Sequence, residues 1–560
     1  MKVLPYVVPA GDPVGPREDL KMRQFTKKWD GLGHWLTLLF IVSLAGYFYF
    51  ANRSGAMPGQ SDESRAYHFT LYSPMIYIVS SFFMQLLRAF DAPYYAIAFV
   101  GTLNVLMIYA LTRRMFSAAA AVFAAIFYAC YGFPLGQSLA LCYPTYVIFF
   151  CLMAFYGVVA ALESGRMGPL CLAGAAMSLM FFFNASAYAP ILALTAVGAY
   201  SANRKIFGAR IGVLPFLSAL ALGAIITYLA CEFYIYRVFG TRPIAGFVYS
   251  PYWKHLFWYH ASPDTGTVEL MGAAATTGLI RTIFKRAFFE SPEALFRNGF
   301  IVVLMSIAMV AMFKRADRRL RIVVGFGMIC LVLLFAGGLF RIHVIHRKPI
   351  APVAISIAMA AGYSIQYLLE RFKRPARKLF WLTLAIYLGL SGFQCQRIVG
   401  SMVSREPILR YLKEHRIPTS QVLTLVPFIN TYQEQVKGIG PMILPIIFNP
   451  RASDHLKGIY NLIDWPRVFG VYGKGQSRYY VTSGIGTQVN IGNNDAILAD
   501  VQPVKIWDFN PANNRYLYEV QKHHDIRLYA LSDIFDRKDN MKRLMSMGAN
   551  GVFPYTKDKA

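Results

Sequence analysis

Residues 52–75 read NRSGAMPGQSDESRAYHFTLYSPM and contain two adjacent carboxylates, Asp62 and Glu63. Strongly apolar runs flank this short polar segment, HWLTLLFIVSLAGYFYF before it and MIYIVSSFFMQLL after it. Carboxylates are scarce elsewhere, since the chain holds 29 Asp and Glu against 56 Lys and Arg. An ionisable group held beside lipid is costly unless it is paired, so the pair is a functional candidate. There it can act as a general base toward a hydroxyl.

The acidic pair also has a purely structural interpretation. Ser61, Asp62 and Glu63 are residue types that cap the first turn of a helix, and a short helix in a solvated loop would use them so. The sequence leaves both interpretations open.

Cations between two late apolar stretches are natural counterparts of these carboxylates. The segment RIHVIHRKPIAP, residues 341–352, holds Arg341, Arg347 and Lys348. Such groups bind a lipid phosphate or pair with the acidic segment. Snorkelling toward lipid headgroups is the alternative.

A third polar group precedes the late apolar stretches. GLIRTIFKRAFFESPEALF predicts an amphipathic helix with Arg281 and Lys285 spaced i, i+4 and Arg286 beside them. These cations contact substrate, or they simply hold the helix on anionic headgroups.

Metal ligands are poorly represented. His343 and His346 are three residues apart, but Pro349 follows and no carboxylate partner is near, so no metal site is predicted. The seven cysteines lie in or beside apolar stretches, which leaves no disulfide framework or CxxC motif.

The elements that carry these groups are membrane helices. The 560 residues are 56% hydrophobic and 15% charged, and the mean hydropathy of +0.41 excludes a soluble globule. Residues 73–90 are also apolar, but their place after the acidic pair predicts a re-entrant or interfacial helix. About eleven spans are predicted, near 34–51, 94–112, 117–134, 144–162, 168–184, 187–201, 211–235, 298–313, 321–340, 350–369 and 379–396.

Orientation follows from the basic clusters KMRQFTKKW, TRR, SANRK, KRADRRLR and RFKRPARK, which fall on one side if the spans alternate. The positive-inside rule makes this side cytoplasmic, so the net charge of +27 reports topology and not a nucleic-acid partner. We expect a multi-pass protein of a bacterial inner membrane, with a cytoplasmic N-terminus, a retained first span and a periplasmic C-terminal region.

Three regions are predicted: a cytoplasmic arm (1–33), a transmembrane module (34–398) with outer loops 52–93 and 238–297, and a soluble α/β domain (399–560). In the last, EPILRYLKEHRIP and RKDNMKRLMSMG predict helices, and QVLTLVPF, SRYYVTSG and IRLYALSD predict strands.

Outside such a membrane no nucleotide donor is available, so a group-transfer reaction there would draw its activated donor from a lipid. A polyprenyl-phosphate sugar fits, with its tail between the helices, its phosphate on Arg or Lys and its sugar facing outward.

The order of features resembles the start of GT-C glycosyltransferases, in the branch that holds protein O-mannosyltransferases, the lipid A aminoarabinose transferase and the RgtA/B/C/D-like glycosyltransferases. SDESRAY, then YSPMIYIVSSFFMQLL, then a span that ends in a basic turn carry the likeness, together with HRKPIAPVAISIAMAAG. The resemblance implies that Asp62 of the Asp62-Glu63 pair is the base, that Tyr67 is the aromatic residue of the motif, and that the donor sugar transfers with inversion. It puts Arg347, with Arg341 and Lys348 nearby, at the donor phosphate.

Two departures from that pattern stand out. The second outer loop, GFPLGQSLALCYP, lacks the carboxylate that some relatives carry, so a divalent metal is not supported. Lys348 stands where the family often has an aromatic residue.

The sequence thus predicts an inverting glycosyltransferase that uses a lipid-linked sugar and a glycan, lipid or protein acceptor. An O-antigen-type polymerase or ligase is an alternative that would not need the acidic pair. A transporter or flippase of a lipid-linked or polysaccharide substrate is a further alternative; it is less favoured, because transporters tend to place ionisable residues at mid-membrane and show paired halves, whereas the spans here hold almost no acids and no duplication is detected. The sugar, the acceptor and the length of the carrier lipid are not determined by the sequence.

Overall fold

The computed structural model of the protein describes most of the apolar helices and the strands of a C-terminal sheet. The predicted arm (1–33), the two predicted outer loops and the interfacial helix at 73–90 lie almost wholly outside the described residues. These are 32–50, 93–139, 143–183, 185–239, 299–315, 317–339, 350–400, 406–424, 442–443, 469, 472–483, 498, 501–509, 524–537, 539 and 542.

Long apolar runs form a bundle of helices, because only regular hydrogen bonding satisfies the backbone in an apolar setting. Short 3-10 turns, η1 (Ala185–Ala187) and η2 (Ile206–Gly208), flank α10. The helices in chain order are α2 (Leu32–Phe50), α5 (Pro93–Met115), α6 (Ala118–Ala129), α7 (Gly132–Leu139), α8 (Tyr143–Ser164), α9 (Gly168–Phe183), α10 (Tyr188–Asn203), α11 (Val213–Phe239), α16 (Gly299–Arg315), α17 (Arg318–Leu339), α18 (Val353–Arg371) and α19 (Arg374–Gly400).

Each of the eleven predicted spans is helical in its described residues, with ends that differ by a few residues from those expected, except that the span over 117–134 is broken between α6 and α7. Among the described residues, six helices are long and apolar enough to cross a membrane, or seven if the bent pair α6–α7 is one span. The helices α2, α9 and α16 are apolar but shorter. The chain is therefore mostly helical and fits a polytopic membrane protein, while the figure of eleven crossings stays a prediction.

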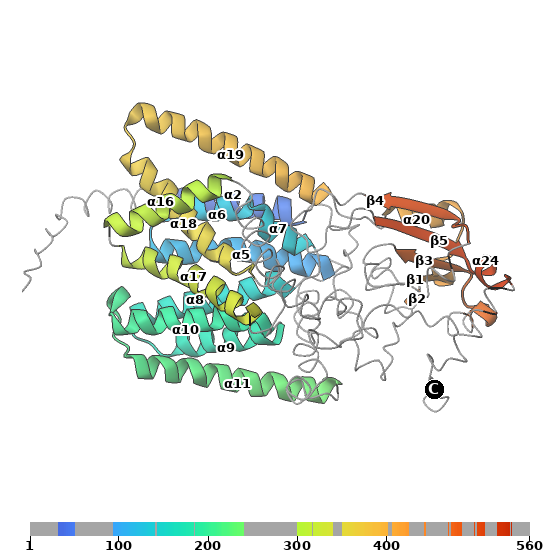
Figure 1. Ribbon diagram of the computed structural model, residues 1–560, viewed down its shortest axis with the longest axis horizontal. Coiled ribbons are helices and arrows are strands. Elements are labelled where there is room, and N and C mark those ends of the chain that lie inside the picture. The colour runs from blue at the N-terminus through green and yellow to red at the C-terminus, as the bar shows by residue number, and fades with distance from the viewer. Residues whose placement is uncertain are drawn as a thin grey trace, which may run out of the picture.

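The two ends of the bundle differ in their connections (Figure 1). The connections between α5 and α6, α8 and α9, α10 and α11, α16 and α17, and α18 and α19 gather at one end, which we call the basic end; four are two or three residues long, and the one between α10 and α11 contains η2. At the opposite end α19 reaches Gly400 and leads toward the sheet, and we call this the domain end. The described cations in or beside these connections include Arg113, Arg114, Arg166, Arg204, Lys205, Arg210, Lys314, Arg318, Arg319, Arg371, Lys373 and Arg374.

Small residues allow the central helices to pack closely. Residues Val353–Ile365 of α18 are all buried, and a Cβ added at Gly362 would collide with the Ala120 carbonyl oxygen of α6. Gly174 of α9 and Gly223 of α11 bring those two backbones equally close. Helix contacts through glycine are typical of membrane bundles, where packing rather than water drives association.

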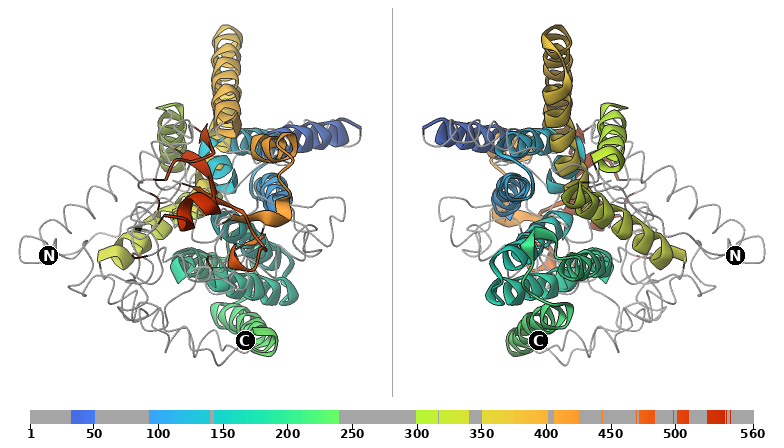
Figure 2. Two further views of the ribbon diagram at one scale, coloured as in Figure 1. Left: turned by 90° about the vertical axis from the view of Figure 1, so that its right-hand side faces the viewer. Right: turned by 90° about the vertical axis from the view of Figure 1, so that its left-hand side faces the viewer.

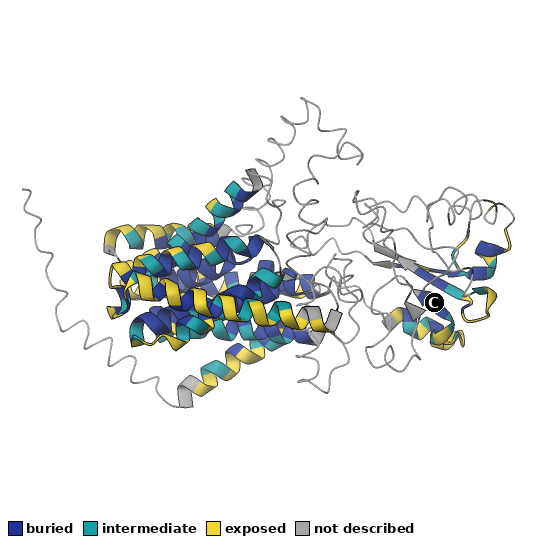
Figure 3. Ribbon diagram, turned by 90° about the horizontal axis from the view of Figure 1, so that it is seen from below, coloured by how far each residue is buried: buried dark blue, intermediate teal, exposed yellow. Residues whose placement is uncertain are grey.

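The peripheral helices turn apolar faces outward. Leu214 and Phe233 of α11 are 76% and 63% exposed, and Leu379 and Phe393 of α19 are 66% and 65% exposed. Figure 3 looks onto the exposed face of α11, and Figure 2 shows α19 leaning away from the bundle. Exposed apolar surface of this extent suits contact with lipid.

The structure corrects one sequence expectation. We predicted a span over 117–134 followed by an outer loop, GFPLGQSLALCYP, but α6 ends at Ala129 and residues 132–139 of that loop form α7, bent by 54° from α6. Proline is tolerated in the first turn of a helix, so Pro134 does not prevent α7. The side chains of Phe133 and Leu135 are fully buried, and this burial holds the short helix against its neighbours.

The C-terminal residues include a five-stranded mixed sheet of order β2-β1-β3-β5-β4. Strand β1 pairs in parallel with β2 and β3, whereas β5 is antiparallel to both β3 and β4. Ile408 and Leu412 of α20 pack on Val422, Val481 and Ile526 of the sheet. The bounds are α20 (Glu406–Glu414), η5 (Thr419–Gln421), β1 (Val422–Thr424), β2 (Met442–Ile443), β3 (Tyr479–Ser483), β4 (Lys505–Phe509), β5 (His524–Ala530) and α24 (Leu531–Phe535).

The predicted helix and strands at EPILRYLKEHRIP, QVLTLVPF, SRYYVTSG and IRLYALSD are confirmed as α20, β1, β3 and β5. The helix expected at RKDNMKRLMSMG lies largely outside the described residues.

Candidate functional site

The side chains that the sequence singled out lie outside the described residues, so their roles stay predictions. They are Asp62, Glu63, Tyr67, Arg281, Arg286, Arg341, Arg347 and Lys348.

The helix ends on either side of these segments are described, and they lie at the domain end. Helix α2 ends at Phe50 and α5 begins at Pro93, and the ring of Tyr49 packs against Gly101 early in α5. Likewise α17 runs from the basic end to Leu339, and α18 starts back from Val353 (Figure 1). The helix ends that bound the acidic segment and the late cationic segment therefore lie at the same end of one bundle.

The end of α2 is fixed by contacts with α19. The hydroxyl of Tyr47 donates a hydrogen bond to Oε1 of Gln396 at 3.1 Å. One residue earlier on α19, the Sγ of Cys395 donates to the carbonyl oxygen of Cys130 at 3.3 Å, at the joint between α6 and α7. The helix that precedes the acidic segment, α2, is thus linked through α19 to the joint between α6 and α7.

An aromatic side chain of α19, Tyr387, also packs against the bundle. Tyr387 stacks on Phe300 of α16 at 4.3 Å and on Phe127 of α6 at 6.2 Å between ring centroids. Aromatic contacts of this geometry hold α19 near the domain end, although it leans away elsewhere.

The start of α18 is rigid and buried. The backbone N–H groups of Val353, Ala354 and Ile355 donate to the carbonyl oxygens of Ile350, Ala351 and Pro352. Ile350 is 2% exposed and Ala351 is fully buried. The first turn is therefore satisfied internally, and the chain enters the core directly after the cationic segment.

A buried amide ties α5 to α8. Asn104 is 1% exposed, and its Nδ2 donates to the carbonyl oxygen of Thr145 at 3.0 Å. A polar side chain buried among apolar helices needs such a partner, so this contact supports the fold of the bundle.

The basic turn after α5 is engaged in the structure. Nε of Arg114 lies 2.6 Å from Oε2 of Glu163, Nη1 donates to the Tyr156 hydroxyl at 3.0 Å, and the guanidinium lies 5.0 Å from that ring centroid. No local sequence pattern indicates this pairing, because Glu163 lies 49 residues away in the chain. Arg114 thus has a structural partner at the basic end, remote from the predicted site.

Metal ligation finds no support in the described part of the chain, where no three His, Cys, Asp or Glu side chains lie close enough to hold an ion. The expectation that no metal is needed stays untested.

Comparison with known proteins gives matches in structure alone. No family model and no curated protein sequence matches the chain. The oligosaccharyltransferase of Archaeoglobus fulgidus in its apo form is 15% identical with a TM-score of 0.39, covering 81% of this chain and 70% of the other. ArnT from Cupriavidus metallidurans, bound to undecaprenyl phosphate, is 10% identical with a TM-score of 0.47, covering 90% of this chain and 99% of the other.

Archaeal AglB from Archaeoglobus fulgidus, in complex with an inhibitory peptide and a dolichol-phosphate, is 16% identical with a TM-score of 0.39, covering 81% of this chain and 69% of the other. TM-scores below 0.5 do not establish a common fold, so the assignment of function rests on the residues of this chain.

Proposed function

We propose that the protein is an integral-membrane glycosyltransferase that moves a sugar from a polyprenyl-phosphate carrier to a hydroxyl acceptor. The reaction takes place at the domain end of the bundle, on the outer face of a bacterial inner membrane. The acceptor is a glycan, a lipid or a protein.

One observation carries the proposal. The chain has an acidic pair and a cluster of cations in two segments far apart in sequence, and the helices that bound both segments meet at the domain end. A base and a phosphate-binding group are the two features that transfer from a lipid phosphate requires.

Chain length limits how far the cations can lie from the start of α18. A chain advances by about 3.3–3.6 Å per residue at most, so Arg347 stays within roughly 11 Å of the Ile350 Cα atom. Because Ile350 is buried at the start of α18, Arg347 and Lys348 are tethered to the domain end in any conformation. Asp62 is twelve residues past Phe50, so its reach of about 40 Å allows but does not force the same position.

The chemistry assigns a role to each residue. Asp62, with Glu63 beside it, accepts the proton of the acceptor hydroxyl while that oxygen bonds to the anomeric carbon from the face opposite the phosphate. The bond from the anomeric carbon to the phosphate oxygen breaks, its electron pair stays on the phosphate, and the configuration inverts. Arg347, Arg341 and Lys348 stabilise the negative charge of the departing polyprenyl phosphate. Tyr67, Arg281 and Arg286 contact substrate.

The deciding experiment measures donor consumption. Wild type and Asp62→Asn are purified in detergent and given a panel of radiolabelled polyprenyl-phosphate sugars, with membrane extract as the source of acceptors. We expect wild type alone to remove label from the lipid fraction, and the donor consumed names the sugar. Normal turnover by Asp62→Asn would remove the residue from catalysis. If wild type consumes no donor, flux of labelled lipid-linked sugar in liposomes tests the transport alternative.

A further inference from the structure

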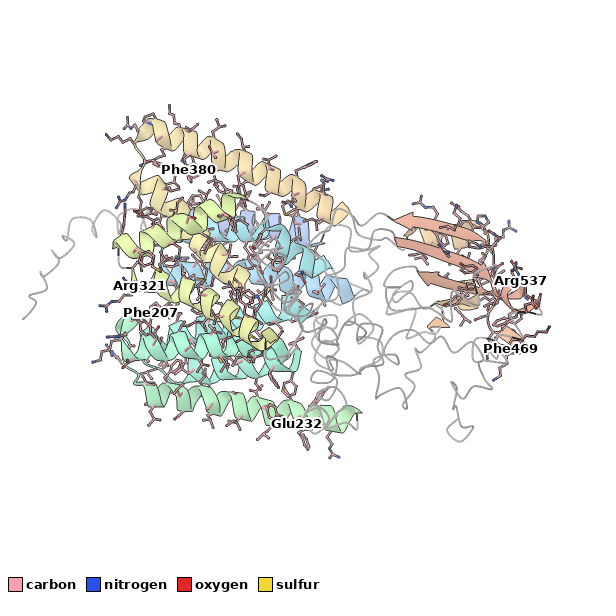
Figure 4. All side chains as sticks on the ribbon, in the orientation of Figure 1. Phe207, Glu232, Arg321, Phe380, Phe469 and Arg537 are labelled. Carbon is pink, nitrogen blue, oxygen red and sulfur yellow. The ribbon has the colours of Figure 1, made fainter. Side chains whose placement is uncertain are left out.

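The basic end of the bundle contains a cavity of about 520 Å³, away from the proposed catalytic end. Four elements line it: the turn between α5 and α6, the loop after α10, the start of α17 and the last turns of α18. Phe207 and Arg321 are labelled at this end in Figure 4, whereas Glu232 lies toward the opposite end of α11. The cavity is thus separate from the segments that carry the proposed function.

Both carboxylates of the cavity are already occupied. Oδ1 of Asp317 accepts hydrogen bonds from the backbone N–H groups of Arg319 at 2.9 Å and Leu320 at 3.2 Å, which caps α17. Oε1 of Glu370 accepts from Nε2 of Gln366 at 2.7 Å. Neither carboxylate forms a salt bridge with a cavity cation among the described residues.

The three cations of the cavity are in different states. Arg319 is fixed, since its Nη1 donates to the Met115 carbonyl oxygen at 2.9 Å and its guanidinium lies 5.3 Å from the ring centroid of Phe207. Lys205 and Arg318 are exposed, and within the described residues neither has an ion pair or a hydrogen bond from its side chain. Two uncommitted cations therefore line the cavity beside a third that is held in place.

The loop after α10, which carries Lys205 and Phe207, has a strained backbone. Lys205 has a φ of 50° and Phe207 a φ of 66°, so two non-glycine residues adopt the left-handed conformation within three positions. Lys205 directly follows the C-cap residue Arg204, at a position where helices usually carry glycine. Strained residues of this kind persist where the surroundings hold them, and they cluster at sites that clamp a ligand.

We propose that this cavity binds the phosphate group of an anionic phospholipid, with Lys205 and Arg318 as its direct contacts. Arg319 contributes charge and holds Phe207 in the wall. A phosphate there pairs with cations that have no other partner, and it joins loops from separate helices, so binding stabilises the basic end. The same chemistry would accept free phosphate, and the lipid is favoured because the surrounding cations lie at the end that the positive-inside rule places at a headgroup layer.

The test measures the thermal midpoint of the full chain in neutral detergent, with added phosphatidylglycerol, phosphatidylcholine or millimolar inorganic phosphate. The variant Lys205→Ala/Arg318→Ala is compared with Arg374→Ala/Lys378→Ala, which removes one Arg and one Lys from the exposed start of α19, outside the cavity. We expect phosphatidylglycerol to raise the Tm of wild type and of the α19 variant by several degrees. The cavity variant should lose at least half of that shift, and phosphatidylcholine should have no effect.

A full shift in the cavity variant would overturn the site. If inorganic phosphate reproduces the shift in wild type and not in the cavity variant, the anion site stands and a lipid source is overturned. Lys205→Gly guards against a folding defect, because glycine adopts the left-handed conformation without strain. We expect Lys205→Gly to keep or raise the Tm without lipid and to reduce the lipid-dependent shift. An undiminished shift in Lys205→Gly would exclude the lysine as a phosphate contact.

Discussion

The two ends of the helical bundle differ in the length of the connections between their helices. At the basic end, the connections 116–117, 165–167 and 372–373 are two or three residues long, and cations lie in them or on the helix turns beside them. At the domain end, helices are separated by 51–92 and 240–298. Short turns fix the helices relative to one another, whereas long connections on a rigid scaffold are where functional residues concentrate.

The density of positive charge does not by itself locate the catalytic site. The basic end holds the greater number of described cations, yet its carboxylates are paired in structural contacts, as Glu163 with Arg114 shows. At the domain end, the helices that bound the carboxylate-containing segment and the helices that bound the cationic segment end close together. The described contacts at the basic end are structural, and we place transfer at the domain end.

Removal of the proposed base should have the greatest consequence for activity. Asp62→Asn should lower turnover by about 10²–10⁴-fold, because a general base contributes that much to the rate. The Tm should not change. The measurement is release of labelled sugar from the lipid donor, and Arg374→Ala at the basic end is the control expected to keep full turnover. Equal losses in both variants would erase the proposed difference between the ends.

The next effect concerns the donor phosphate. Arg347→Ala should raise the KM for the lipid-linked sugar by about 10–100-fold, since a charge-assisted hydrogen bond contributes roughly 1.5–3 kcal/mol. The KM for the acceptor should stay unchanged. Steady-state kinetics with each substrate varied in turn makes the measurement, and an unchanged donor KM would remove Arg347 from the site.

A packing substitution tests the scaffold that both ends share. Gly362→Ala should destabilise the bundle by about 1–3 kcal/mol, because the new methyl group meets the backbone of α6. Gly389→Ala on α19 is the matched control, since nothing lies within 4 Å of its added Cβ. Thermal unfolding in detergent compares them. A Tm for Gly362→Ala equal to that of the control would show that α6 and α18 can move apart without loss of stability.

The smallest expected effect concerns the ion pair at the basic end. Arg114→Ala and Glu163→Gln should each lower stability by about 1 kcal/mol, and the double variant should lose less than the sum, because the two side chains form one interaction. Turnover should be unchanged. High salt should shrink the coupling energy in a double-mutant cycle. A coupling energy of zero would mean that the contact contributes nothing to stability.

Most helical segments follow from local sequence. Long apolar runs leave the backbone no other way to satisfy its hydrogen bonds, so the stretches that became the apolar helices other than α7 were predictable from local composition. Helix α20 and strands β1, β3 and β5 also followed from local patterns. Strand β4 did not, since KIWDF is short and gains its place only by pairing with β5.

Other features were decided by tertiary structure alone. The sequence placed residues 132–139 in a loop, but burial of Phe133 and Leu135 against other helices makes them α7. The Ser117 hydroxyl donates to Gln366 across 249 residues, which no local window can register. The cavity at the basic end needs four elements to converge, so it arises from long-range packing. Hydropathy predicts single helices, whereas a cavity or site forms where separate helices pack together.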